Sequence, residues 1–319
     1  MNDKSMLKSI LTLPEYSLEE ISMMLSKMQK TKTNFPKVKR RYSVVGDILA
    51  YNHCKRQYGF FVRRKYSAAQ SAQLFFGSVI HETLDRAHAH YRGEIAGIPK
   101  GSIPTDEDIE RYFEKAETSL RAQGIRPLSK SSREKALEYV KKFNSSQGPK
   151  IYPCVVDTEH RLEMDKGEYI LRGVVDVIAK NKNSTTWSDY EIWDYKGAKV
   201  PEKGSREMKN YEFQMRVYAH LYELRNKVKP AKAVLWFLAE NDTKKQSVEV
   251  ILNDTLIQQA VNQFETTVAK IENSIITDDW SNISRKDAPS EDTCTACDIR
   301  WNCKARPFKI RALDQVCNI

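Results

Sequence analysis

The chain has 319 residues, 40% of them hydrophobic, which is enough for one large domain or two ordinary ones. Lys and Arg exceed Asp and Glu by 10, and the pI of about 9.1 favours a polyanionic partner. The first twenty residues contain acids and lack a signal peptide's apolar stretch, and no apolar run is long enough to span a bilayer. Six cysteines are too few for a disulfide framework. We expect a soluble, cytoplasmic protein without a membrane partner.

Residues 1–42 are predicted to form a helix followed by a basic linker, and residues 43–319 to form the main domain. The Ser17 side chain can cap the helix while Glu20 completes a capping box. An apolar stripe follows on one helix face, made by Leu18, Ile21, Met24, Leu25 and Met28. This stripe is a candidate docking surface for a partner, and packing against the protein's own core is an equally good interpretation.

Cations alternate with aromatic residues between positions 54 and 66. This mixture suits the phosphates and stacked bases of single-stranded DNA. The candidate DNA contacts are Arg56, Tyr58, Arg63 and Arg64. The alternative is a solvated basic face above a partly buried aromatic stripe.

Helices are predicted next, over residues 72–90, 106–122 and 131–143. The glycines and prolines of residues 91–105 indicate a loop, and Gly124 is a plausible C-terminal cap for the second helix. Residues 95–150 are therefore expected to form a helical insertion.

From Tyr152 the sequence takes on the period of strands. Residues 152–164, 169–180 and 190–197 are rich in Val, Ile, Tyr and Trp and are separated by polar turns, which predicts an antiparallel meander. A long helix over 205–226, strands over 233–239 and 246–252, and a helix over 255–275 complete an α/β fold.

The predicted chemistry lies on the second and third strands of the meander. Alternation along a strand places Asp194 and Lys196 on one face, and Asp176 ends a motif on the neighbouring strand. Two converging carboxylates repel each other unless a hard cation such as Mg²⁺ or Mn²⁺ lies between them. Such a cation holds a scissile phosphate and activates water, which Lys196 would orient. The alternative is a cross-strand salt bridge.

The cysteines suggest a second metal centre. Cys294, Cys297 and Cys303 can place three thiolates around one centre, and Cys54, 240 residues before Cys294, is the natural fourth ligand. A structural zinc site is the alternative reading. Cys154 fits a buried apolar position better.

These motifs together resemble the PD-(D/E)xK nuclease superfamily, and in particular its RecB-like branch. The resemblance lies in GVVD at 173–176, EIWDYKG at 191–197 and QMRVY at 214–218. It implies that Gln214 and Tyr218 position the substrate strand and the lysine. It also implies that His81 and the Tyr195 carbonyl join Asp176 and Asp194 as metal ligands.

The four cysteines are similar to the iron–sulfur staple of AddB-type nucleases, Cas4 proteins and the exonuclease V family. That resemblance implies a [4Fe–4S] cluster that pins the C-terminal part to the start of the nuclease domain, across roughly residues 43–308. The sequence departs from the pattern at Lys55, where a proline is usual, and in a longer turn between Asp176 and Asp194. The N-terminal helix and residues 95–150 have no place in a minimal Cas4, which favours an AddB-like nuclease.

The sequence therefore predicts a Mg²⁺- or Mn²⁺-dependent deoxyribonuclease. A single-strand-specific exonuclease in DNA end processing, repair or defence is the favoured function, and 5′-to-3′ polarity follows from the resemblance alone. No phosphate-binding loop is found, so a helicase partner would be supplied by another chain. The alternative is a non-catalytic DNA-end-binding subunit of a helicase–nuclease complex.

Overall fold

The computed structural model describes residues 17–30, 38–65, 72–180, 186–280, 289, 294 and 297–303. The chain divides into two units, residues 1–39 and residues 40–319, and each is described by itself. In the described part of the chain, no helix is long and apolar enough to cross a membrane.

The first unit contains helix α2, Leu18–Lys30. Its predicted capping box is present, because the Ser17 hydroxyl accepts a hydrogen bond from the Glu20 backbone N–H at 3.2 Å. In return, the Glu20 carboxylate accepts one from the Ser17 N–H at 2.8 Å. Leu18 is 86% exposed within this unit. The side chains of Met24, Leu25 and Met28 lie outside the described residues.

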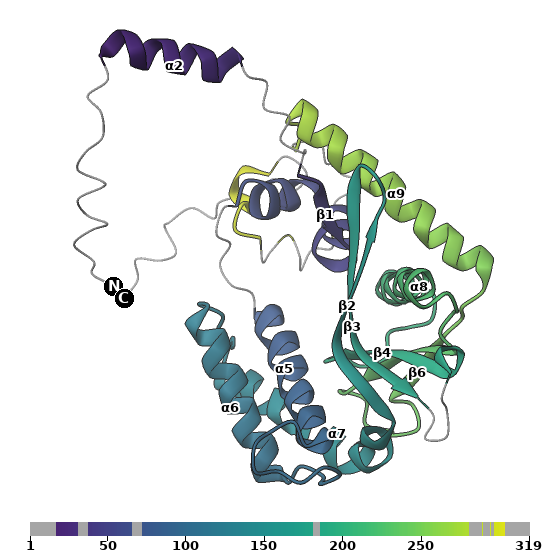
Figure 1. Cartoon of the computed structure of the whole chain (residues 1–319). Helices are drawn as coiled ribbons and strands as arrows, with labels where there is room; N and C mark the ends of the chain where they lie inside the picture. The colour runs from purple at the N-terminus through teal and green to yellow at the C-terminus, as the bar shows by residue number, and fades with distance from the viewer. Residues whose placement is uncertain are drawn as a thin grey trace, which may run out of the picture. The chain divides into compact units, whose positions relative to one another are not determined.

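The second unit contains a six-stranded sheet and helices on both of its faces (Figure 1). Its strands are β1 (Arg40–Ser43), β2 (Val155–Asp165), β3 (Tyr169–Lys180), β4 (Tyr190–Lys196), β5 (Lys232–Phe237) and β6 (Ser247–Val250). Its long helices are α5 (Ala72–Arg92), α6 (Asp106–Ala122), α7 (Lys130–Ile151), α8 (Arg206–Asn226) and α9 (Asp254–Thr277).

Strand β3 organises the sheet. It pairs antiparallel with β2 along one edge, while its other edge is shared by β1 at its start and β4 at its end. The predicted meander of β2, β3 and β4 is therefore confirmed. Strand β5 then adds parallel to β4 after the crossover helix α8, and β6 pairs antiparallel with β5.

Two hydrophobic cores pack against this sheet. Their helices lie on opposite faces of the sheet in Figure 1. Helices α8 and α9 cover the first core, which includes Met215, Tyr222 and Phe264. Helices α5, α6 and α7 form the second, which includes Leu84, Phe113 and Phe143. Burying apolar side chains on both faces is the main favourable contribution to folding of the sheet.

Side chains of β3 line both cores. Val175 packs in the first core, whereas Val177, two residues on, packs in the second. Asp176 lies between them and is 9% exposed. A carboxylate thus stands at the seam of the two cores.

Residues 40–63 were not anticipated as structured elements around the first core. After β1, a wide helical turn spans Val44–Leu49, followed by α3 (Ala50–His53), α4 (Lys55–Gln57) and a second wide turn, Tyr58–Arg63. Ile48 and Tyr58 are buried in the first core beside Trp280. The sequence of this segment shows no clear helical period, and tertiary packing is therefore what orders it.

Helix α7 is longer than the predicted helix over 131–143. It continues to Ile151 and includes Pro149 in its last turn. Gly148 lies under the ring of Tyr152, where a Cβ atom would meet the ring at 2.8 Å. Packing of this last turn in the second core overrides the local helix-breaking preference of Gly and Pro.

Candidate metal and catalytic site

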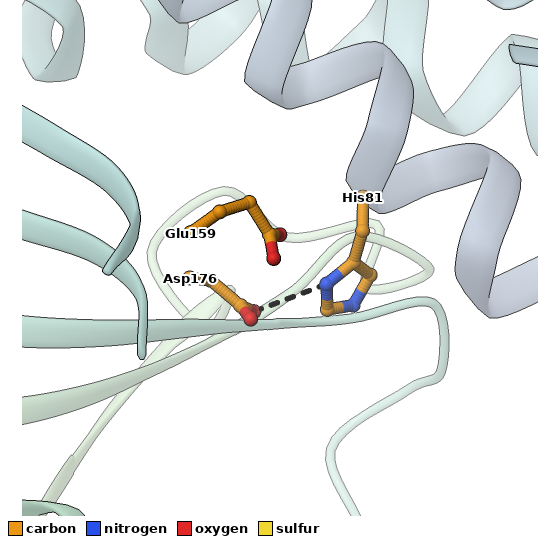
Figure 2. A group of neighbouring side chains, drawn as sticks. All are labelled: His81, Glu159 and Asp176. Atoms are coloured by element: carbon orange, nitrogen blue, oxygen red, sulfur yellow. Dashed lines mark ion pairs between the residues drawn. The ribbon is translucent and has the colours of Figure 1, made fainter. Parts of the chain in front are cut away.

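Three side chains from three elements converge beside the seam (Figure 2). His81 comes from α5, Glu159 from β2 and Asp176 from β3, and one ligand atom of each lies within 4.8 Å of the others. The His81 Nδ1 atom is 3.3 Å from the Asp176 Oδ2 atom. The structure thus brings His81 and Asp176 together as predicted, and it adds Glu159.

Glu159 is held in a backbone conformation that glutamate rarely adopts. Its φ angle is +50°, although it lies in the middle of a strand. Thr158 pairs with Val177 and His160 pairs with Val175, so Glu159 stands opposite Asp176 without any change of register. A non-glycine residue in this region costs on the order of 1 kcal/mol or more, and such strain is concentrated at functional sites.

The second part of the site is a network around Lys196. Its ammonium lies 2.5 Å from the Asp194 Oδ2 atom and donates a hydrogen bond to the Gln214 side-chain carbonyl at 3.1 Å. The Gln214 amide then donates to Asp194 Oδ1 at 2.7 Å and to the Tyr218 hydroxyl at 3.2 Å. Gln214 therefore ties the carboxylate and the ammonium together. The ring of Tyr211 also lies under the lysine, 4.6 Å from its Nζ atom to the ring centroid.

A backbone hydrogen bond joins the two parts of the site. The Tyr195 N–H donates to Asp176 Oδ2 at 2.7 Å, which holds this carboxylate against strand β4. The Tyr195 side chain points into the second core, where its hydroxyl lies 2.9 Å from the His88 Nε2 atom. The predicted alternation along β4 is thus present: Tyr195 is in the core, and Asp194 and Lys196 face α8.

The charges of the site shift each other's pKa values. Burial opposes the charge on His81, but the Asp176 carboxylate outweighs it and raises the pKa of His81 to about 9. Burial also disfavours the charge on Asp176, yet His81 and Lys196 hold its pKa below the usual value. Burial and the Asp176 charge raise the pKa of Glu159 to about 7. Burial, with Asp176 nearby, raises the pKa of Asp194 to about 6 despite Lys196.

These residues fit a hard divalent cation. Two ligands of one Mg²⁺ ion lie at most about 4.2 Å apart, twice the metal–oxygen bond length. The spacing of His81, Glu159 and Asp176 is close to that limit. Asp194 Oδ2 is buried and accepts no well-oriented hydrogen bond, although Lys196 is close. Acidic charge is thus concentrated where it repels itself, and a cation would relieve that repulsion.

The four residues predicted to contact DNA lie in different environments. Tyr58 is 3% exposed, and its hydroxyl donates to Asp47 at 2.9 Å, so its ring cannot stack on a base without leaving the core. Arg64 pairs with Asp278 at 2.8 Å. The guanidinium of Arg56 lies 5.1 Å from the centroid of the Phe60 ring. Arg63 ends the second wide turn.

The charges of two C-terminal cysteines act on Cys54. Burial raises the pKa of Cys54, and the charges of Cys297 and Cys303 add to the effect. A turn connects Cys294 and Cys297, because the Cys297 N–H donates a hydrogen bond to the Cys294 backbone carbonyl at 3.2 Å. Among the described cysteines, no three sulfur atoms lie mutually within 4.8 Å.

The fold and this site define a nuclease class. Residues 45–304 match the family model described as the PD-(D/E)XK nuclease superfamily, and the chain therefore belongs to that superfamily.

Two solved structures are similar to this chain, and the first of them supports the fold. One described as a "putative exonuclease" from Eubacterium rectale has a TM-score of 0.50 and 14% sequence identity, covering 91% of this chain and 98% of that one. The structure of SSO0001 has a TM-score of 0.40 and 13% identity, covering 90% of this chain and 97% of that one. No curated protein matches the sequence.

Glu159 is the site residue that sequence reasoning missed. It belongs to no motif of the nuclease resemblance, and it precedes Asp176 by a full strand and turn. The signal that could have found it is the strand register. Pairing the first two predicted strands as a hairpin sets position 159 opposite position 176.

Proposed function

We propose that this protein is a Mg²⁺- or Mn²⁺-dependent deoxyribonuclease that hydrolyses phosphodiester bonds in single-stranded DNA. The observation that carries this proposal is the junction of two carboxylates and one lysine at the seam. Asp176 and Asp194 are buried, and Lys196 lies 2.5 Å from Asp194. A site used only for gripping DNA gains nothing from two carboxylates that repel a phosphate.

In this proposal His81, Glu159, Asp176, Asp194 and the Tyr195 carbonyl hold the cation. The cation, when bound, supplies positive charge to the phosphate and lowers the pKa of a water molecule. Glu159 is included because it shares a ligand-sized space with His81 and Asp176.

Lys196 is the residue proposed to act on the attacking water. Its ammonium is already held at a fixed point by Gln214, so it can orient the water or stabilise charge building on the phosphate. Gln214 and Tyr218 act as positioning residues, because Gln214 is hydrogen-bonded to Lys196 and Asp194, and Tyr218 to Gln214.

Digestion of end-labelled DNA tests the proposal. Single- and double-stranded substrates, linear and circular, are incubated with Mg²⁺ or Mn²⁺ and either the wild-type chain, Asp194→Ala or the control Glu163→Gln. Glu163 is an exposed residue on the same strand as Glu159. We expect metal-dependent loss of linear single strands with wild type and control only. Cleavage by Asp194→Ala equal to wild type would exclude this site.

The single metal site is the reason for the proposed strand preference and helicase partner. One metal site acts on one backbone at a time, so we propose exonuclease action on single strands, slow action on blunt duplexes and a helicase supplied by another chain. Rapid processive digestion of blunt duplex by the purified chain alone, without ATP, would show that no helicase is needed.

We further propose that Cys54, Cys294, Cys297 and Cys303 hold a [4Fe–4S] cluster. Four thiolates are the ligand set of such a cluster. The charges of Cys297 and Cys303 act on Cys54, which supports a link between the start of the domain and its C-terminal segment. The cluster would clamp these segments together.

The metal content of anaerobically purified protein tests the cluster. We expect brown protein with about four irons per chain. Cys54→Ala should lose iron and solubility, whereas the matched control Cys154→Ala should keep both. A colourless wild type with one zinc ion per chain would replace the cluster by a zinc clamp.

A further inference from the structure

One face of α8 extends the catalytic site toward the start of that helix. Tyr218, Gln214, Asn210 and Arg206 follow each other at intervals of four residues and therefore share a helix face. Asn210 and Arg206 lie about 6 and 12 Å from Gln214 along the helix axis. Whatever binds at Asn210 is thus a neighbour of the proposed cleavage point.

Two adjoining pockets meet at Asn210, and their linings differ in chemistry. The first has a volume of about 370 Å³ and is lined by polar side chains of α3, α8 and α9, with Arg206 and Lys270 as its cations. The second has a volume of about 330 Å³, and its apolar wall includes Leu49, Phe61 and Val62. Among the described residues, no Asp or Glu lines either pocket.

The first pocket suits a phosphate. Amide and hydroxyl groups from Asn52, Gln263 and Thr266 surround its two cations, and neutral donors with cations are the groups that hold phosphate oxygens. Arg206 is fixed at the wall, because its guanidinium donates to the Asn52 carbonyl at 3.2 Å.

The second pocket suits a flat, uncharged ring. Phe61 offers an aromatic side chain, and His53 and Gln57 offer hydrogen-bonding groups at the edge. Burial, together with the charge of Arg206, lowers the pKa of His53, which favours the neutral imidazole. An apolar wall with a few polar groups is the usual environment of a bound nucleobase.

We infer that these two pockets form a nucleotide subsite for single-stranded DNA, with the phosphate beside Arg206 and Lys270 and the base against Phe61. Asn210 lies between the two parts. A base can enter the second pocket only when it is unpaired, so the subsite selects single strands. This inference rests on the proposed nuclease function and names a part of its substrate-binding surface.

Binding of fluorescent oligonucleotides tests the phosphate half of the subsite. The measurements use the full chain carrying Lys196→Ala, so that the DNA is not cut. Arg206→Ala and Lys270→Ala should each weaken single-strand binding about five- to tenfold and reduce the salt slope by about one. The control Lys209→Ala, an exposed cation on α8 outside both pockets, should change affinity less than twofold. If all three changes weaken binding equally, the DNA is attracted by the overall positive charge of the surface and not by this pocket, and the inference is overturned.

An abasic scan tests the base half. One abasic nucleotide is moved along the oligonucleotide, and a single position should weaken binding about tenfold. At that position the Phe61→Ala variant should lose little more, because the same contact is removed twice. A uniform response along the strand, or full additivity with Phe61→Ala, would contradict a base pocket.

The outcomes separate this inference from the proposed function. Site-specific single-strand binding by a chain that never cuts DNA with any metal would leave the subsite standing and refute the nuclease. If the protein cleaves DNA and neither Arg206→Ala nor Lys270→Ala changes the KM of cleavage, the nuclease function would stand and the subsite would be refuted. Melting curves of each variant show whether the fold is kept.

Discussion

Replacing Glu159 by glutamine should have opposite effects on the protein with and without its cation at pH 8.5. Without metal, the change removes a carboxylate within 4.8 Å of the ligand atom of Asp176. Two unit charges at that distance repel by about 3 kcal/mol at an effective dielectric of 20. The opposing attraction between Glu159 and the largely protonated His81, together with solvent at the exposed Glu159, reduces this to about 1 kcal/mol. The metal-free variant should therefore melt about 2 °C higher than wild type.

With Mn²⁺ the order should reverse. Losing one hard ligand should weaken cation binding about 10- to 100-fold, which lowers the stabilisation by saturating metal by about 1.4 to 2.7 kcal/mol. The Mn²⁺-induced rise in melting temperature should therefore be smaller in Glu159→Gln by about 3 to 6 °C. Thermal melts in EDTA and in Mn²⁺, with calorimetric titration of Mn²⁺, measure both effects.

The matched control is Glu163→Gln on the same strand, which should behave as wild type in both conditions. An unchanged Mn²⁺ response in Glu159→Gln would remove Glu159 from the metal site. A metal-free variant no more stable than wild type would show that its charge is not repelled by Asp176, and the strained backbone would then need another explanation.

Three further predictions follow from the same geometry. Folding raises the pKa values of His81 and Glu159 to about 9 and 7, so the stability that their protons provide is present at low pH and is lost as pH rises through these values. The Mn²⁺-induced rise in melting temperature should therefore grow between pH 6 and pH 9. Lys196→Ala should abolish cleavage while calorimetry shows Mn²⁺ binding largely intact; equal loss of both would contradict its role with water. Gly173→Ala should lower the melting temperature and slow cleavage, because its Cβ would meet the Tyr218 ring at 2.9 Å, and overpacking costs about 1–3 kcal/mol.

Local signals were sufficient for most of the helices and strands. The α6 helix begins at a capping box formed by Thr105 and Asp108, and it is followed by Gly124 at a φ angle of +80°. Such signals act within a few residues, so they can be read without knowing the fold. The meander was likewise visible in short alternating runs.

The structural features that could not be predicted from the sequence depend on contacts between residues far apart in the chain. Strand β1 is four residues long and exists because it pairs with the start of β3. Tyr58 was placed among the DNA contacts, but a ring can be recognised as buried only when its neighbour Trp280, more than 200 residues away, is known. Glu159 was missed for a related reason, since its meaning comes from the residue opposite to it.

In the candidate site, residue identity was easier to predict than arrangement. The spacing of Gln214 and Tyr218 on one helix face placed both near the catalytic strand, and their hydrogen bonds are present. Sequence spacing placed Asp194 and Lys196 on one strand face, but it did not show that Gln214 would tie this pair into one group while Glu159 joins His81 at Asp176 in another. Charge pairing and burial decide that division, and both require the three-dimensional structure.

The seam between the two cores has a consequence for the order in which the candidate site is assembled during synthesis. His81 stands on a helix of one core, and Gln214 stands on a helix of the other. A growing chain folds from its N-terminus, so the histidine is made well before α8 emerges. Until that helix has packed, Lys196 lacks the Gln214 side chain that holds its ammonium. The candidate site is therefore completed only when helices of both cores have packed against the sheet.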